Sequence, residues 1–331
     1  MVHLEKGTMT LRWGLIGSGD IARKRVAPAL RDLASCDLVA VCRGRPELAE
    51  AFAREFGARR WYATPEELLA DDEIDAVYLA TPVHLHAAHA IAAAHAGKHV
   101  LCEKPMAMNV KECDEMIAAC AANGVALGVA YYLHFYPAVL KIKALIASGE
   151  LGKLVMSQIN VFEFRNPSPD DPRHWFIVGA QAGGGPMFDF GCHRLEMFLN
   201  MCGPVRDVTS MMGNVVFDRD VEDTGVAVLR FESGAYATLS VTHAAVEPKD
   251  TLDMFFTEGS VHVDPLNDGL VRIRRGHEES VEALPPAPNF HLPLIEEFVE
   301  AVNAGRVPAV PGETGRRVAS IEEKIYMTYV R

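Results

Sequence analysis

The first third of the chain alternates short apolar segments with amphipathic segments of helical spacing, and this alternation constrains the fold more than any other feature. The apolar segments predict strands at residues 11–16, 37–42, 75–80, 99–102 and 125–130. The segments between them predict helices at residues 20–33, 46–56, 83–96 and 109–122. Apolar strands separated by helices indicate a parallel sheet covered on both faces. We therefore expect an α/β fold whose N-terminal part, residues 1–133, is a Rossmann-type doubly wound parallel sheet.

The second part of the chain has a different pattern. Longer strands are predicted at residues 154–164, 208–217, 225–231, 235–243 and 251–257, and Ser-Gly, Glu-Gly and Asn-Asp-Gly turns lie among and after them. This pattern predicts a C-terminal α+β domain, residues 134–331, with a large, mainly antiparallel open sheet. A linker at 284–290 precedes an amphipathic helix at 291–305. A C-terminal helix could pack back on the first domain.

Composition and charge exclude several classes of partner. The 331 residues are 49% hydrophobic and 23% charged, as in an ordinary globular protein. The 44 acidic residues outnumber the 32 lysines and arginines, and the net charge of −12 argues against nucleic acid or an anionic membrane. There is no apolar run of membrane-spanning length and no secretory signal, and seven cysteines without paired spacing indicate reduced thiols. We expect a cytoplasmic protein.

A glycine-rich turn lies directly between the first predicted strand and the first predicted helix. Gly17-Ser18-Gly19 is followed by Ala22 in the position of a third small residue. Such a turn is tight, lets the backbone approach a pyrophosphate and directs helix amides at the phosphates. The residues expected to contact a dinucleotide are Gly17, Ser18, Gly19, Asp20 and Ile21. The alternative is an ordinary tight turn.

The end of the second predicted strand discriminates between cofactors. An NAD site usually carries an acidic residue there, which accepts hydrogen bonds from the ribose hydroxyls. This chain has Arg43 and Arg45 instead, and no carboxylate before Glu47. Two guanidinium groups suit a 2′-phosphate, so the sequence favours NADP(H) over NAD(H). Two surface arginines without a ligand are the alternative.

Two further motifs carry chemistry. The strand at 99–102 stops at Glu103-Lys104-Pro105, and in a parallel sheet this end shares a rim with Thr81-Pro82. Farther along, three glycines and a proline lead into a helix that places Asp189 and His193 four residues apart on one face. An Asp beside a His can orient the imidazole for general acid/base work. A surface or capping pair is the alternative.

The layout as a whole resembles the Gfo/Idh/MocA oxidoreductases, a family that includes glucose–fructose, inositol and sugar dehydrogenases. The similar segments are GLIGSGDIA (14–22), ATPVHLHAAHA (80–90), AGKHVLCEKP (96–105), AGGGPMFDFGCH (182–193), FTEGSV (256–261) and HLPLIEEFVEAVNAGRVP (291–308). They are spread over nearly the full chain.

The resemblance implies roles for individual residues. Lys104 would reach both the nicotinamide ribose and the reacting hydroxyl, with a cis bond to Pro105, while Asp189 and His193 complete the site. His193 would take the hydroxyl proton, which a cationic Lys104 favours by keeping the imidazole neutral. Residues implied to contact the cofactor beyond the glycine turn are Thr81, Pro82, His84, His86, Glu103 and Lys104. Residues implied or expected to contact the substrate are Lys104, Tyr132, His134, Trp175, Asp189 and His193.

The chain departs from the family pattern at two points. Members often have an arginine within 131–137, where this chain has His134, and many have Trp-Arg where this chain has Trp175-Phe176. The second departure makes one pocket edge less polar and disfavours a phosphorylated substrate. The aromatic residues near Tyr132 could stack on a sugar ring or simply pack in the core.

These observations predict an oxidoreductase that transfers a hydride between NADP(H) and a secondary alcohol or ketone of a sugar, cyclitol or related polyol. A nicotinamide-dependent glycosidase acting by transient oxidation and a non-catalytic dinucleotide sensor are the alternatives. The presence of Lys104, Asp189 and His193 together argues against the sensor. No metal is expected, because the histidines between 84 and 99 lack cysteine or carboxylate partners at ligand spacing. The open sheet suggests a homodimer or homotetramer.

Overall fold

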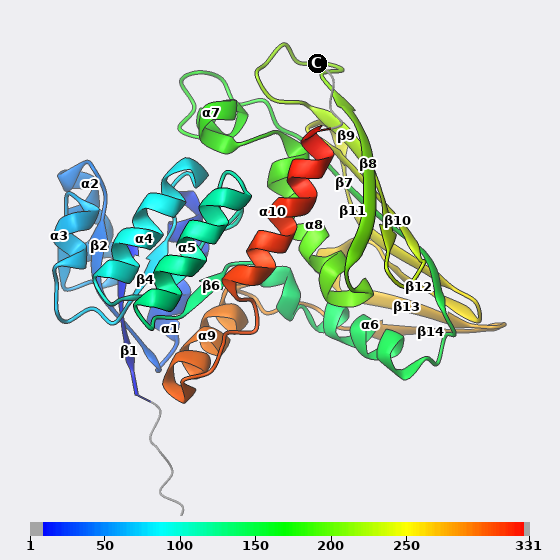
Figure 1. Cartoon of the computed structure of the whole chain (residues 1–331), viewed down its shortest axis with the longest axis horizontal. Coiled ribbons are helices and arrows are strands. Elements are labelled where there is room, and N and C mark those ends of the chain that lie inside the picture. Colours follow the sequence, from blue (N-terminus) through cyan, green and yellow to red (C-terminus); the bar gives the residue numbers. More distant parts are fainter. Residues whose placement is uncertain (1–8, 328–331) are drawn as a thin grey trace, which may run out of the picture.

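Strands and helices alternate along the first part of the computed structural model, which describes residues 9–327, and form a parallel sheet here called sheet A (Figure 1). Its strands are β1 (Leu11–Ile16), β2 (Cys36–Cys42), β3 (Arg60–Tyr62), β4 (Ala76–Leu79), β5 (His99–Cys102) and β6 (Leu127–Val129). They lie in the order β3-β2-β1-β4-β5-β6, and every adjacent pair is parallel. The expected doubly wound sheet is confirmed. The direction of winding reverses between β1 and β4, where such sheets bind ligands.

Helices cover both faces of sheet A. They are α1 (Ala27–Asp32), α2 (Pro46–Phe56), α3 (Pro65–Leu69), α4 (His86–His95) and α5 (Val110–Ala122). Trp13 and Leu15 belong to the cluster that contains α1 and α2, whereas Val77 and Leu79 belong to the cluster that contains α3, α4 and α5. The strands are therefore apolar on both sides, which explains their uninterrupted apolar sequences.

A helix from the C-terminal end of the chain also covers sheet A. The ring of Phe298, in α9 (Leu292–Ala304), lies 5.7 Å from that of Trp13. A Cβ atom on Gly128 would lie 2.8 Å from the Phe298 ring, so a glycine in β6 lets this helix approach. α10 (Gly312–Met327) then packs against both α5 and α8 (Figure 1).

The second sheet, here called sheet B, has eight strands. They are β7 (Leu154–Phe164), β8 (Val205–Gly213), β9 (Thr224–Phe231), β10 (Tyr236–Thr242), β11 (Ala244–Phe256), β12 (Gly259–Val263), β13 (Leu270–Arg275) and β14 (Glu278–Ala283). Their order is β14-β13-β12-β11-β7-β10-β9-β8, and β7 with β10 is the one parallel pair. The long helix α8 (Pro186–Cys202) packs on one face, with α6 (Pro137–Ser148) beside it, and α7 (Gly179–Ala182) precedes α8. The expected open, mainly antiparallel sheet is confirmed.

Several predicted elements have different bounds, and for two of them the contacts show a physical cause. The strand expected at 208–217 ends at Gly213, because the backbone N–H groups of Val215, Val216 and Phe217 donate to the Asp223 carboxylate instead of to a neighbouring strand. The helix expected at 20–33 is widened into a π-helical turn over 22–26 before α1. Pro28, at the start of α1, has no N–H to donate to the preceding turn, which fits this irregularity.

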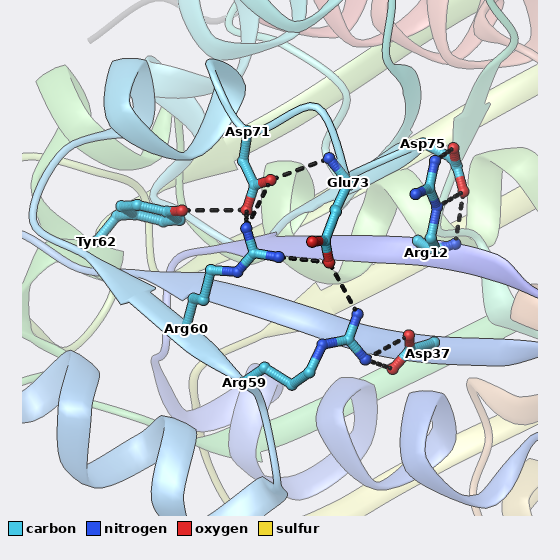
Figure 2. Close-up of polar contacts among 8 residues, drawn as sticks. All are labelled: Arg12, Asp37, Arg59, Arg60, Tyr62, Asp71, Glu73 and Asp75. Carbon is cyan, nitrogen blue, oxygen red and sulfur yellow. Dashed lines mark hydrogen bonds and ion pairs between the residues drawn. The ribbon is translucent and has the colours of Figure 1, made fainter.

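A network of polar contacts and a separate Arg12–Asp75 pair lie at the amino ends of β1 to β4 (Figure 2). Asp71 accepts hydrogen bonds from Arg60 Nη1, Tyr62 Oη and the Glu73 amide, each at 3.0 Å. Glu73 pairs in turn with Arg59 and Arg60, and Arg12 donates to Asp75. The network fastens the short edge strand β3 to the loop after α3, at the end of the sheet opposite the ligand rim.

Candidate active site

The carboxyl ends of β1, β4 and β5 bring three predicted motifs to one rim. Ala80 N donates to Ile16 O at 2.8 Å, and Glu103 N donates to Leu79 O at 2.9 Å. These bonds place the glycine turn, Thr81-Pro82 and Glu103-Lys104 side by side. The Lys104–Pro105 peptide bond is cis.

The glycine turn has the shape of a phosphate cradle. Gly17 has φ +97°, and a Cβ there would lie 2.5 Å from Ala80 O, so only glycine fits. A Cβ on Gly19 would meet nothing within 4 Å, which leaves the mouth of the turn open. Ser18 Oγ is buried and has no hydrogen-bond partner among the described residues. An open turn with an orphaned hydroxyl fits a dinucleotide pyrophosphate.

Positive charge gathers next to this turn. Arg43 Nη1 donates to Ser18 O at 3.1 Å, which fixes its guanidinium beside the turn. Burial lowers the pKa of Arg43, and the neighbouring charges of Arg45 and Arg23 lower it further. Like charges held together in this way favour binding of an anion, as a ribose phosphate would provide.

Lys104 and Asp189 form the central ion pair of the site. Lys104 Nζ donates to Asp189 Oδ1 at 2.8 Å, and both side chains are largely buried. Burial opposes the ammonium charge, but the Asp189 carboxylate outweighs it and raises the pKa of Lys104. Burial likewise opposes the carboxylate charge, but Lys104 and Arg165 hold the pKa of Asp189 far below its ordinary value. The pair therefore stays ionised at neutral pH.

Arg165 is a third member of this group that the sequence reasoning missed. It follows the last residue of β7, and its Nη1 donates to Asp189 Oδ2 at 2.7 Å. Its guanidinium lies 5.3 Å from the ring centre of Phe176 and 5.0 Å from that of Phe190. The sequence feature that indicates Arg165 is its position directly after a predicted strand. Local sequence does not identify Asp189 as its partner.

His193 lies beside the pair as a buried imidazole. Its ring is 4.7 Å from the Tyr132 ring in an edge-to-face arrangement, and Nδ1 has no hydrogen-bond partner among the described residues. Burial lowers the pKa of His193 well below its ordinary value, and the charges of Lys104 and Arg194 act in the same direction. The ring is therefore neutral near pH 7 and able to accept a proton.

The expectation that Asp189 orients the His193 imidazole is corrected by this geometry. The described hydrogen bonds of the Asp189 carboxylate come from Lys104 and Arg165. These two groups are cationic at neutral pH, so they attract the carboxylate more strongly than a neutral imidazole does.

Glu103 anchors the backbone of Lys104. Its Oε1 accepts hydrogen bonds from Tyr78 Oη at 2.8 Å and from His291 Nε2 at 3.1 Å, and its Oε2 accepts one from Lys104 N at 3.1 Å. Burial opposes ionisation, but His291, Lys104 and Tyr78 together lower the pKa of Glu103. These contacts occupy both of its oxygens, so Glu103 orients the turn that carries Lys104. The contact between Glu103 and the cofactor that the resemblance implies stays a prediction.

The predicted histidines near the rim are placed differently from one another. His86 is 1% exposed, and its two nitrogens lie 3.0 Å from Pro105 O and 2.8 Å from Thr81 O. It therefore braces the two rim turns, whereas the resemblance implied that His86 contacts the cofactor. His84 is exposed, and its Nδ1 donates to Gln181 O at 3.3 Å across the gap to α7.

The remaining predicted residues divide into two groups. On the cofactor side, Asp20 is exposed and paired with Lys24, while Ile21, Thr81 and Pro82 are half-buried at the rim. On the substrate side, His134 Nδ1 lies 2.7 Å from the buried Glu196 carboxylate. Trp175 stacks on Phe176 with ring centres 4.0 Å apart. Among residues 9–327 there is no group of three or more histidine, cysteine or acidic side chains suited to a metal ion.

Both parts of the chain match models of one protein family. A model described as an oxidoreductase family with an NAD-binding Rossmann fold matches residues 11–131, and the GFO/IDH/MocA C-terminal domain matches residues 139–262. The chain belongs to the Gfo/Idh/MocA oxidoreductase family. It is therefore a dehydrogenase or reductase of the class that acts on CH–OH groups.

Relatives in the Gfo/Idh/MocA family act on sugars by name. The chain is 30% identical to 1,5-anhydro-D-fructose reductase of Ensifer adhaerens over 92% of each chain. It is 31% identical to D-xylose 1-dehydrogenase (NADP(+)) 2 of Haloferax volcanii over 96% of each. A levoglucosan dehydrogenase solved with NADH and levoglucosan superimposes with a TM-score of 0.87, 25% identity and 96% coverage of both chains. Within residues 9–327, no helix has the length and apolar character needed to cross a membrane.

Proposed function

We propose that this protein transfers a hydride between NADP(H) and a secondary alcohol or ketone of a sugar, cyclitol or related polyol. The observation that carries the proposal is the Lys104–Asp189 ion pair beside the neutral imidazole of His193, on the rim that also holds the glycine turn. Such an arrangement provides a fixed cation and a proton acceptor side by side among buried side chains.

Each group has a distinct task in this chemistry. The bound nicotinamide supplies the hydride acceptor or donor. His193 takes the proton of the substrate hydroxyl during oxidation, and the Lys104 ammonium stabilises the developing alkoxide. Asp189 and Arg165 keep Lys104 charged and in place. In reduction the same groups return the proton.

The preference for NADP(H) rests on the arginines at the end of β2. Arg43 lies against the glycine turn, where burial and the neighbouring charge of Arg45 both lower its pKa. One relative carries NADP in its name, which fits this preference, whereas the levoglucosan dehydrogenase was solved with NADH.

Substrate contacts are proposed for Tyr132, His134 and Trp175. Tyr132 touches the His193 ring, so a sugar ring bound at His193 would lie against an aromatic surface. The stacked Trp175 and Phe176 form an apolar surface beside Arg165, whose guanidinium lies 5.3 Å from the Phe176 ring centre. An uncharged polyol fits such aromatic surfaces better than a phosphorylated one.

The test is a thermal-shift panel of sugars, cyclitols and polyols in the presence of NADP(H) or NAD(H), followed by assays of the absorbance of reduced nicotinamide. We expect stoichiometric formation or loss of reduced cofactor with an uncharged polyol or its ketone. Release of sugar from a glycoside without net change in that absorbance would favour the hydrolase instead. No turnover with any compound that shifts the melting temperature would contradict an enzymatic role.

We also propose that sheet B mediates self-association. Its face opposite α8 presents partly exposed apolar side chains on β9, β10 and β11, among them Val226, Val228, Tyr236 and Phe255. A second copy would cover this surface. Light scattering of the native chain and of Val228→Glu tests this: a dimer or tetramer that dissociates in the variant supports the proposal, and a native monomer contradicts it.

A further inference from the structure

His291 stands where the linker from sheet B reaches sheet A. The linker leaves β14 with Leu284 N donating to Gly269 O at 2.7 Å, and Asn289 Nδ2 donates to Arg25 O at 2.8 Å. His291 follows as the N-cap residue of α9, and the buried residues of α9 belong to the same cluster as those of sheet A. The His291 ring is 1% exposed, so it lies in the interior at this junction.

One contact of His291 leads to Lys104. Its Nε2 donates to Glu103 Oε1 at 3.1 Å, and the other oxygen of Glu103 accepts from Lys104 N at 3.1 Å. Tyr78 Oη shares Oε1 at 2.8 Å. The carboxylate is buried, so loss of one donor leaves charge unsatisfied in the turn that carries Lys104.

A second contact of His291 leads to His193. The His291 ring centre lies 5.1 Å from that of Tyr132, and Tyr132 lies 4.7 Å from His193. Phe290 stacks on Tyr132 at 5.8 Å, and the Arg25 guanidinium covers Phe290 at 4.2 Å. Tyr132 is therefore clamped between the linker and the imidazole.

From these contacts we propose that His291 is a positioning residue that sets the places of both Lys104 and His193. The proposal rests on the hydride-transfer function proposed above. His291 acts on Lys104 through Glu103 and on His193 through Tyr132. The linker thereby couples the C-terminal part of the chain to the reacting groups.

The test compares His291→Ala, His291→Gln and Val299→Ala in the full chain. Val299, in α9, is 1% exposed and lies about two helical turns beyond His291, so its truncation removes buried packing from the same helix without removing a hydrogen bond to Glu103 or a ring contact to Tyr132. We expect His291→Ala to lower kcat about 10- to 100-fold with little change in KM, because misplaced reacting groups slow chemistry more than binding. His291→Gln keeps an N–H donor for Glu103 and should recover most of that loss. Val299→Ala should lower Tm and leave kcat unchanged.

The proposal is overturned if His291→Ala, assayed at a temperature where it is folded, keeps the native kcat. It is also overturned if Val299→Ala lowers kcat as much as His291→Ala, or if His291→Gln has a kcat no higher than that of His291→Ala. A second readout does not depend on turnover: the His193 Hε1 resonance, assigned through His193→Gln, should shift in His291→Ala and stay in place in Val299→Ala. If the native chain turns over no polyol, the proposed function fails. The His193 resonance then tests the positioning role of His291 independently, because an unchanged chemical shift in His291→Ala contradicts that role.

Discussion

The ammonium of Lys104 and the carboxylate of Asp189 lie 2.8 Å apart although 85 residues separate them in the chain. Lys104 follows the end of β5 in sheet A by two residues, whereas Asp189 lies in the first turn of the helix that covers sheet B. The ion pair therefore joins the two sheets at the point where cofactor and substrate are proposed to meet.

Removing either reacting group should abolish most turnover. Lys104→Ala takes away the cation that stabilises the alkoxide, and His193→Ala takes away the proton acceptor. Each should lower kcat at least about 100-fold while NADP(H) still binds. Steady-state kinetics and cofactor fluorescence titration measure the two effects. Lys143→Ala, which removes a surface contact to Asn200, is the control; near-native turnover in both site variants would contradict the assignment.

Cofactor preference should follow the charge at the end of β2. Arg43→Asp replaces the guanidinium beside the glycine turn with a group that repels a 2′-phosphate and accepts from ribose hydroxyls. The ratio of kcat/KM for NADP(H) over NAD(H) should fall by at least about tenfold. Arg54→Asp, on the exposed side of α2, should leave the ratio unchanged. An unaltered ratio in Arg43→Asp would refute the role of Arg43.

Arg165 should hold Asp189 in place. In Arg165→Gln the carboxylate loses its 2.7 Å partner and is free to rotate away from Lys104. We expect kcat/KM to fall about 10- to 100-fold, with partial recovery in Arg165→Lys, which keeps the charge but not the planar guanidinium. Arg173→Gln breaks an exposed pair with Asp171 in the loop after β7 and should have no effect. Equal losses in both glutamine variants would point to loop folding instead.

Acid should destabilise the fold through buried histidines. His243 is fully buried, and burial lowers its pKa from 6.5 to about 3. Between these two pKa values the unfolded chain binds a proton at His243 and the folded chain does not. The free energy of unfolding therefore decreases as the pH falls from 6.5 toward about 3, by on the order of 1 kcal/mol per pH unit. Tm measured from about pH 7 to about pH 4.5 should fall less steeply in His243→Gln. His277→Gln, at the exposed turn before β14, should keep the native slope.

The polar network at the amino ends of sheet A should depend on its buried member (Figure 2). The Asp71 side chain is 4% exposed and that of Glu73 is 51% exposed. Asp71→Ala removes the acceptor of the Tyr62 hydroxyl and one of the two carboxylate partners of Arg60, so we expect a loss of about 1–3 kcal/mol in the free energy of unfolding. Glu73→Ala should lose less than about 1 kcal/mol. Urea denaturation measures both, and equal losses would contradict this ranking.

Local sequence was sufficient to predict those elements and turns that depend on interactions between residues close in the chain. The apolar strands of sheet A, the Gly17 turn and the end of β5 at Glu103 follow from side-chain periodicity and backbone freedom, and the structure has them where they were expected. Element bounds were less accurate where a distant group intervened, as when the Asp223 carboxylate ends β8 at Gly213.

The partners of the site residues were decided only by the tertiary structure. Sequence spacing placed Asp189 beside His193, but the folded chain also brings Lys104 and Arg165 to the same carboxylate, and two cations outcompete a neutral imidazole. His291 reaches Glu103 across 188 residues because α9 buries its apolar face on sheet A. Periodicity determines which face of a helix or strand is buried. Which charged side chains pair in the interior depends on how those faces pack. An unpaired charge is costly when buried, so a buried charge pairs with an oppositely charged group that the packing brings near it.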